Sequence, residues 1–131
     1  EIAVPYVDEL LEYQHFGYAV SDPTADVTGQ DAASKAAIIA MVAFGADICF
    51  DDVLFEGIED ITSSDMAFAQ KAGATIKLLA MVTKSDDEIE ARVYPAMLPN
   101  SHPLASVRDS FNAVFIDKSS KIKLGIKSFY C

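Results

Sequence analysis

The sequence predicts an α+β domain in which helices pack on one face of a mainly antiparallel (mixed) sheet. Helical patterns occupy the first half of the chain and four strand patterns occupy the second half, which is the order typical of this class. Hydrophobic residues make up 51% of the sequence, which is enough for a hydrophobic core. A chain of 131 residues is too short for two such cores. We therefore expect a single domain over residues 1–131.

Two helices are predicted in the first third of the chain. Residues 5–16 have a weakly helical pattern that Gly17 is suited to end. Residues 31–44 are polar in the first turn and then apolar on all sides, which predicts a buried helix. Thr28 and Asp31 have the spacing of a capping box at its start, and Gly45 is suited to its C-terminal end.

The remaining elements are mostly strands. Residues 46–58 mix β-branched and aromatic side chains and predict short extended pieces, and Thr62 with Asp65 predicts a capped short helix ending at Gly73. A strand pattern that is apolar on both faces, a polar turn and a strand pattern that alternates then predict a hairpin, followed by two further strands. The predicted strands are residues 74–83, 88–98, 110–117 and 122–130.

Composition excludes several classes of function. A net charge of −10 and a sequence pI near 4.4 repel a phosphate backbone, so we expect no nucleic-acid partner. No window reaches the roughly 20 apolar residues of a membrane helix, and we expect no membrane partner. Cys49 and Cys131 are too few for a disulfide framework, which favours a cytoplasmic location, and Cys49 is predicted to be a small core residue.

The segment 17–35, GYAVSDPTADVTGQDAASK, gathers polar residues at the entrance to the predicted buried helix. Asp31 and Lys35 are four residues apart and share one helix face, so an ordinary ion pair worth about 0.2 to 0.5 kcal/mol is one explanation. The alternative is chemical, because Lys35 is expected at the edge of a buried surface, where an ammonium is suited to proton transfer.

Metal and histidine chemistry have weaker support. The three aspartates of the segment, Asp22, Asp26 and Asp31, do not have the spacing of a calcium loop, and we predict no metal site. Asp22 precedes a proline and is suited to a turn, whereas Asp26 has no evident capping role. His102 has no neighbouring histidine or cysteine and is predicted to be a turn residue.

The same residues resemble a known family. The pattern GYAxxDPTADVxGxDAAxKAAI, followed in order by AFG, FEGI, IKLLA, ARVYP, HPLASV and FNAVF, is similar to the catalytic, substrate-binding domain of homoserine dehydrogenase. The resemblance extends over residues 8–115, which is most of the chain.

The resemblance implies an NAD(P)-dependent oxidoreductase that interconverts L-homoserine and L-aspartate 4-semialdehyde in the biosynthesis of threonine, methionine and isoleucine. It implies that Lys35 and Asp31 are catalytic residues, with Lys35 in proton transfer at the substrate oxygen. It assigns Asp26 and Tyr18 to substrate binding. A cytoplasmic homodimer is the assembly that the family implies.

Departures from the family pattern define an alternative. Val20 stands where the family usually has a glutamate that binds the substrate amino group, and valine cannot accept such a hydrogen bond. The chain shows no glycine-rich dinucleotide-binding pattern, so NAD or NADP is expected to bind in the full-length enzyme and not to this fragment. The fragment alone is therefore expected to be inactive. The alternative function is a non-catalytic dimerisation or interaction module.

Overall fold

The computed structural model describes residues 24–86, 88–107, 113–117 and 121–125. It contains a five-stranded sheet in the order β1-β3-β2-β5-β4, with helices on either side. The expected α+β class with a mixed sheet is thereby confirmed, whereas the helices lie on both faces of the sheet and not on one face as expected. The predicted helix over residues 5–16 lies outside the described residues.

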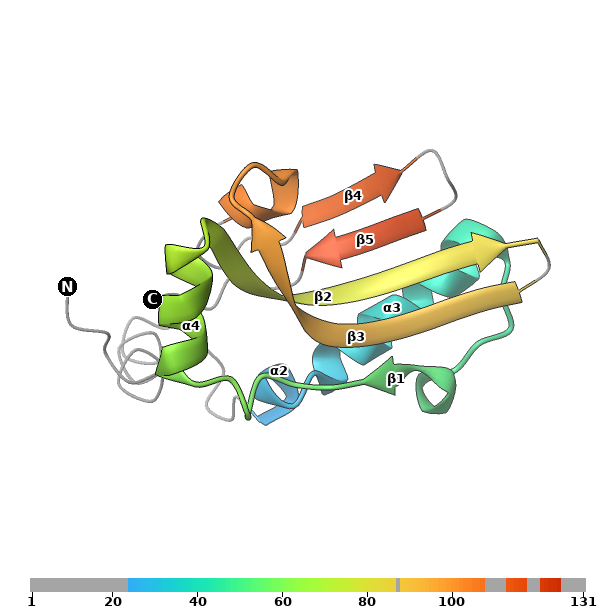
Figure 1. Cartoon of the computed structure of the whole chain (residues 1–131). Helices are drawn as coiled ribbons and strands as arrows, with labels where there is room; N and C mark the ends of the chain where they lie inside the picture. Colours follow the sequence, from blue (N-terminus) through green and yellow to red (C-terminus); the bar gives the residue numbers. More distant parts are fainter. Residues whose placement is uncertain (1–23, 87, 108–112, 118–120, 126–131) are drawn as a thin grey trace.

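The hairpin is the centre of the sheet (Figure 1). β2 (Ala74–Ser85) pairs antiparallel with β3 (Glu88–Pro99) along its whole length. The side chains of β3 alternate between the two faces as predicted, because Ala91 and Val93 are buried while Glu90 is exposed. β5 (Lys121–Gly125) and β4 (Ala113–Asp117) extend the sheet on the β2 side by antiparallel pairing.

β1 (Leu54–Phe55) makes the sheet mixed, since it pairs parallel with β3 at the opposite edge. A 3-10 turn, η1 (Phe50–Asp52), precedes it. Cys49 lies just before this turn and is exposed, with its thiol donating to Asp52 Oδ2 at 3.0 Å. The prediction that Cys49 is a core residue was wrong, because its thiol caps a surface turn. The side-chain hydrogen bond from Cys49, followed by that from its backbone, lowers the pKa of Asp52.

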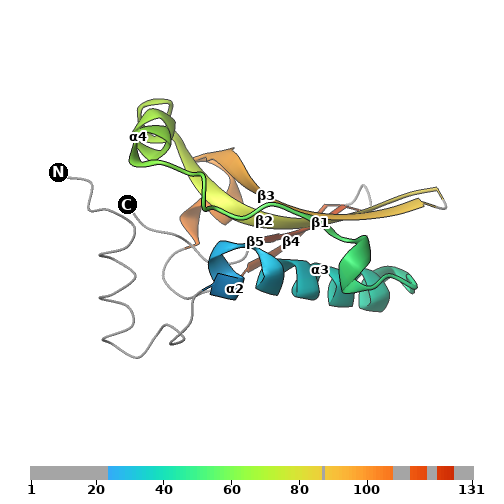
Figure 2. The same ribbon diagram turned by 90° about the horizontal axis from the view of Figure 1, so that it is seen from below.

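α3 (Gln30–Phe44) packs against one face of the sheet, under β1, β3 and β2, with the short α2 (Thr24–Val27) at its start (Figure 2). Alanines form its contact with the strands, and they lie in the main core together with Leu78, Val82 and Val93. The buried alanines of α3 are Ala32, Ala33, Ala36, Ala37 and Ala40. Because alanine side chains are so short, the helix backbone lies close to the sheet.

α4 (Ser63–Lys71) lies on the other side of the sheet, next to the start of β2 (Figure 2). Its predicted capping box is confirmed. The Thr62 hydroxyl accepts from the Asp65 backbone N–H at 3.2 Å, and Asp65 Oδ2 accepts from the Thr62 backbone N–H at 2.9 Å. No helix in the described part of the chain is both long and apolar enough to cross a membrane.

A second, smaller cluster lies on the face opposite α3. It joins Leu79 and Leu98 to the turn η2 (Pro103–Ser106), which follows β3. His102 begins this turn, and its Nδ1 accepts from the Leu104 backbone N–H at 3.1 Å. The prediction that His102 is a turn residue is confirmed.

Candidate active site

The candidate site is built at the junction between α2 and α3. Gly29 occupies the N-terminal cap position of α3 with φ 83°, a left-handed conformation that glycine adopts without strain. The Thr28 hydroxyl donates to the Thr24 carbonyl at 2.9 Å. The predicted capping box of Thr28 with Asp31 was therefore wrong: Gly29, and not Thr28, is the cap residue of α3, and the Thr28 hydroxyl completes the preceding turn.

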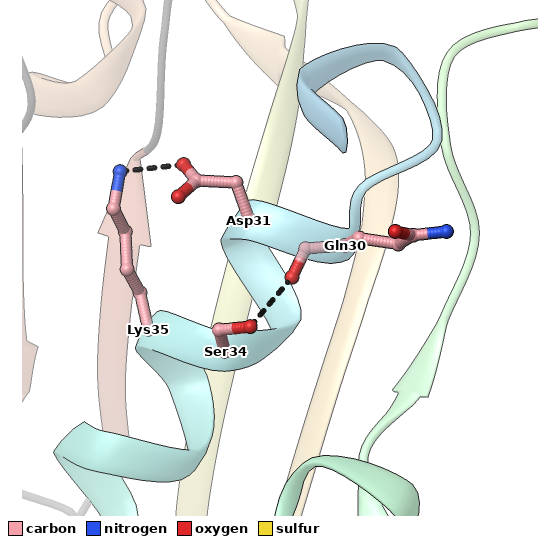
Figure 3. Close-up of polar contacts among 4 residues, drawn as sticks. All are labelled: Gln30, Asp31, Ser34 and Lys35. Carbon is pink, nitrogen blue, oxygen red and sulfur yellow. Dashed lines mark hydrogen bonds and ion pairs between the residues drawn. The ribbon is translucent and has the colours of Figure 1, made fainter. Parts of the chain in front are cut away.

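Asp31 and Lys35 form an ion pair on the first turns of α3 (Figure 3). Lys35 Nζ lies 2.6 Å from Asp31 Oδ2. Figure 3 shows both side chains on one flank of the helix, while the side chain of Gln30 points away from that flank. The shared face expected from the spacing is confirmed.

The pair is partly open to solvent. The side chains of Lys35 and Asp31 are 40% and 37% exposed. Further along α3, at helical spacing from Lys35, Ile38 is 54% and Val42 83% exposed. The prediction of a helix buried on all sides was wrong, because only the alanine side faces the sheet. The flank of α3 that carries the ion pair thus continues as an exposed apolar surface.

Asp26 and Tyr18 complete the set of predicted site residues. Asp26 lies in α2, just before the junction, and its side chain is half-buried; its carbonyl accepts from the Gly29 N–H at 3.4 Å. Tyr18 lies outside the described residues, as does Val20. The structure therefore brings Asp31 and Lys35 into contact and places Asp26 in α2, the short helix that precedes α3.

In the described ranges, no residues are evident that would bind a metal ion or a nucleotide cofactor. No group of three or more histidine, cysteine, aspartate or glutamate side chains is arranged to hold a metal ion there. The hairpin-based sheet with its single parallel pair differs from the parallel βαβ units that bind dinucleotides. The described residues therefore do not fit NAD(P).

Two structurally important residues were missed at the sequence level. Lys77 is buried, 5% exposed, and its ammonium donates to the Val107 carbonyl at 2.7 Å, which ties η2 to β2. Its position inside the apolar run IKLLA was the available signal. Gly57 packs directly against the junction of α2 and α3, and its only signal was a glycine in an extended segment.

Comparison with known proteins identifies the family. A profile of the homoserine dehydrogenase family matches residues 3–127. The chain belongs to the homoserine dehydrogenase family.

Individual relatives agree with this assignment. The homoserine dehydrogenase of Corynebacterium glutamicum is 52% identical over 124 residues, which is 91% of this chain and 28% of that protein. The Bacillus subtilis homoserine dehydrogenase is 42% identical over 112 residues, covering 86% of this chain and 26% of its own length. The chain thus spans less than a third of the length of each of these two relatives.

Solved homoserine dehydrogenases have the same fold. A crystal structure of the Staphylococcus aureus enzyme at pH 6.5 superposes with a TM-score of 0.82 at 29% identity, covering 98% of this chain and 33% of that one. The Thiobacillus denitrificans enzyme gives a TM-score of 0.80 at 32% identity, covering 96% of this chain and 30% of its own.

Proposed function

We propose that this chain is the substrate-handling part of an NAD(P)-dependent enzyme that interconverts L-homoserine and L-aspartate 4-semialdehyde, within the biosynthesis of threonine, methionine and isoleucine. The observation that carries the proposal is the Lys35 to Asp31 contact of 2.6 Å on an open flank of α3, in a chain of this family. The nicotinamide, bound elsewhere in a full-length enzyme, supplies the acceptor for hydride.

We assign Lys35 to proton transfer at the substrate oxygen. When the homoserine alcohol is oxidised, its hydroxyl proton passes to Lys35 in the neutral amine form, and in the reverse direction the Lys35 ammonium returns that proton to the aldehyde oxygen. An ammonium at hydrogen-bond distance from that oxygen also stabilises the negative charge that develops on it. Because its side chain is 40% exposed, Lys35 remains accessible to a substrate.

Asp31 and Asp26 are assigned to holding the lysine and the substrate. Asp31 Oδ2 accepts from the Lys35 ammonium, which limits the directions in which Nζ can point. Asp26 lies across the junction from Asp31, where we propose that its carboxylate contacts polar groups of the substrate. Tyr18 is proposed to contribute to the same pocket.

A chimeric enzyme tests this function. Residues 3–127 would replace the matching segment of the C. glutamicum homoserine dehydrogenase, and homoserine oxidation would be followed by nicotinamide absorbance. We expect an active chimera in which Lys35→Ala lowers kcat by about 100- to 10,000-fold, the usual loss on removing a positioned acid or base. We expect no turnover from the isolated 131 residues with either cofactor.

A control variant distinguishes the loss of a catalytic group from the loss of a positive charge elsewhere in the domain. Lys71→Ala on α4 removes a lysine far along the chain from the pair, and we expect it to leave kcat unchanged. A chimera that folds but does not oxidise homoserine, or a Lys35→Ala chimera with full kcat, would contradict the proposed function.

The proposed assembly is a cytoplasmic homodimer. Edge strand β4 exposes Val114 and Ile116, which are 56% and 69% exposed, and Leu54 on edge strand β1 is 74% exposed. Apolar side chains at the edge of a sheet favour association with another chain. The same observation supports the alternative function, a dimerisation module without chemistry.

A further inference from the structure

The segment 55–58 connects the sheet to the junction of α2 and α3. The Glu56 N–H donates to the Val93 carbonyl of β3 at 2.9 Å, and the Ile58 N–H donates to the Val27 carbonyl of α2 at 2.9 Å. Two consecutive backbone contacts therefore fix the end of α2 relative to the middle of the sheet. Gly57 lies between them.

Gly57 allows this contact because it has no side chain. A Cβ at Gly57 would lie 2.7 Å from both Cα and the carbonyl carbon of Thr28, and closer still to the Val27 carbonyl oxygen. These are backbone atoms, which cannot rotate away as a side chain does. From the other side, a Cβ at Gly29 would lie 3.3 Å from the Glu56 carbonyl oxygen. At Gly57 only a hydrogen atom fits, whereas a Cβ at Gly29 would require Glu56 to shift by a few tenths of an ångström.

The junction lies between the residues assigned to the reaction. Asp26 precedes it in α2, whereas Asp31 and Lys35 follow it in α3. We propose that Gly57 is a positioning residue of the enzyme, which sets the placement of Asp26 relative to the Asp31 and Lys35 pair by letting segment 55–58 lie against residues 27–29. This inference rests on the proposed function for the roles of those three side chains.

Substitution of Gly57 by alanine must displace the junction or the segment. A displacement of about 1 Å in a catalytic group costs about 100-fold in rate. In the active chimera, Gly57→Ala is therefore expected to lower kcat/KM for homoserine about 100-fold and to raise KM for homoserine. KM for the nicotinamide cofactor is expected to stay unchanged, because the displaced residues are assigned to the substrate.

Gly73→Ala is the matched control. Gly73 has φ 69° and no atom within 4 Å of its Cβ position, so alanine there strains the backbone without touching the junction. It lies between α4 and β2, outside the proposed site. We expect its kcat/KM for homoserine per folded molecule to equal that of the unsubstituted chimera. A Gly57→Ala enzyme as active as the Gly73→Ala enzyme overturns the proposal.

A second variant and a second measurement apply if Gly57→Ala does not fold. Gly29→Ala has the same left-handed strain as Gly73→Ala but also meets Glu56, so it alone of the two is expected to raise KM for homoserine. Hydrogen exchange needs no activity: Gly57→Ala or Gly29→Ala should speed amide exchange in residues 24–35, and Gly73→Ala should not. Equal exchange in that segment overturns the inference, whereas an inactive chimera with the expected exchange contradicts only the proposed function.

Discussion

At the scale of single residues, the Asp31 and Lys35 pair contributes little to stability, and we propose that its role is chemical. Both side chains are more than a third exposed, and an i,i+4 pair of this kind contributes about 0.2 to 0.5 kcal/mol in isolated helices. A contribution of that size does not explain why a charged pair stands on a helix that is otherwise largely apolar. Access for a substrate explains it better, which is the reason for assigning Lys35 to proton transfer.

Asp65 provides a prediction about pH at the same scale. Hydrogen bonds from the Thr62 hydroxyl and then from its backbone N–H lower the pKa of Asp65 from its ordinary value of 3.8. Because folding lowers this pKa, the stabilisation is present above the unfolded value and is lost as pH falls through the folded value. Asp65→Asn should thus lower the melting temperature at neutral pH and have little effect at a pH well below 3.8.

Thermal unfolding followed by circular dichroism at the two pH values checks this. Asp60→Asn, at an exposed turn before α4, is the control and should change the melting temperature little at either pH. A deficit of Asp65→Asn that is equally large in acid would contradict the capping role of the ionised carboxylate.

At the scale of elements, the sequence predicted what local chemistry decides. The hairpin was predictable because an apolar run, a polar turn and an alternating strand pattern follow one another at β2 and β3, and the start of α4 was predictable from Thr62 and Asp65. The start of α3 was not, since the left-handed Gly29 displaced the expected cap. The exposed flank of α3 was not predictable either, because helical periodicity does not say how much of an apolar helix the sheet covers.

The alanine side of α3 gives a prediction about packing. Ala36 is 0% exposed in the core between α3 and the sheet, so Ala36→Leu must push the two apart or strain side chains. Overpacking of this kind costs about 1 to 3 kcal/mol of unfolding free energy. Ala43→Leu is the matched control, since Ala43 is exposed on the same helix and alanine and leucine have similar helix propensities. Urea denaturation of both variants should show a lower midpoint for Ala36→Leu alone.

At the scale of the whole molecule, the site was predictable only in part. The spacing of Asp31 and Lys35, with the family pattern, indicated the pair that the structure brings together. The contribution of Gly57 was not predictable, because it depends on the close approach of two backbone segments that are far apart in the sequence. The parallel pairing of β1 with β3 is equally a long-range contact without a local signal.

Sedimentation velocity tests the proposed homodimer. We expect the 131-residue chain to dimerise and Ile116→Lys to shift it to monomer, because a charge at the exposed edge strand opposes pairing. Phe68→Lys on α4 is the control, as Phe68 is 66% exposed on a helix, away from the edge strands. An unsubstituted chain that stays monomeric at all concentrations contradicts this assembly. A dimer together with an inactive chimera favours the module without chemistry.

The five buried alanines of α3, which contact the sheet, also determine how this domain can be engineered. Because alanine side chains have a single carbon, they set the distance between α3 and the sheet. Lys35 is adjacent in sequence to the buried Ala36. A larger residue at one of these alanines strains side chains or pushes α3 away from the sheet, and a displaced α3 carries both members of the ion pair with it. A directed-evolution library aimed at new substrates should therefore keep the five alanines fixed and randomise the open flank at Ile38 and Val42. Variation there alters the surface next to the lysine without displacing the helix that carries it.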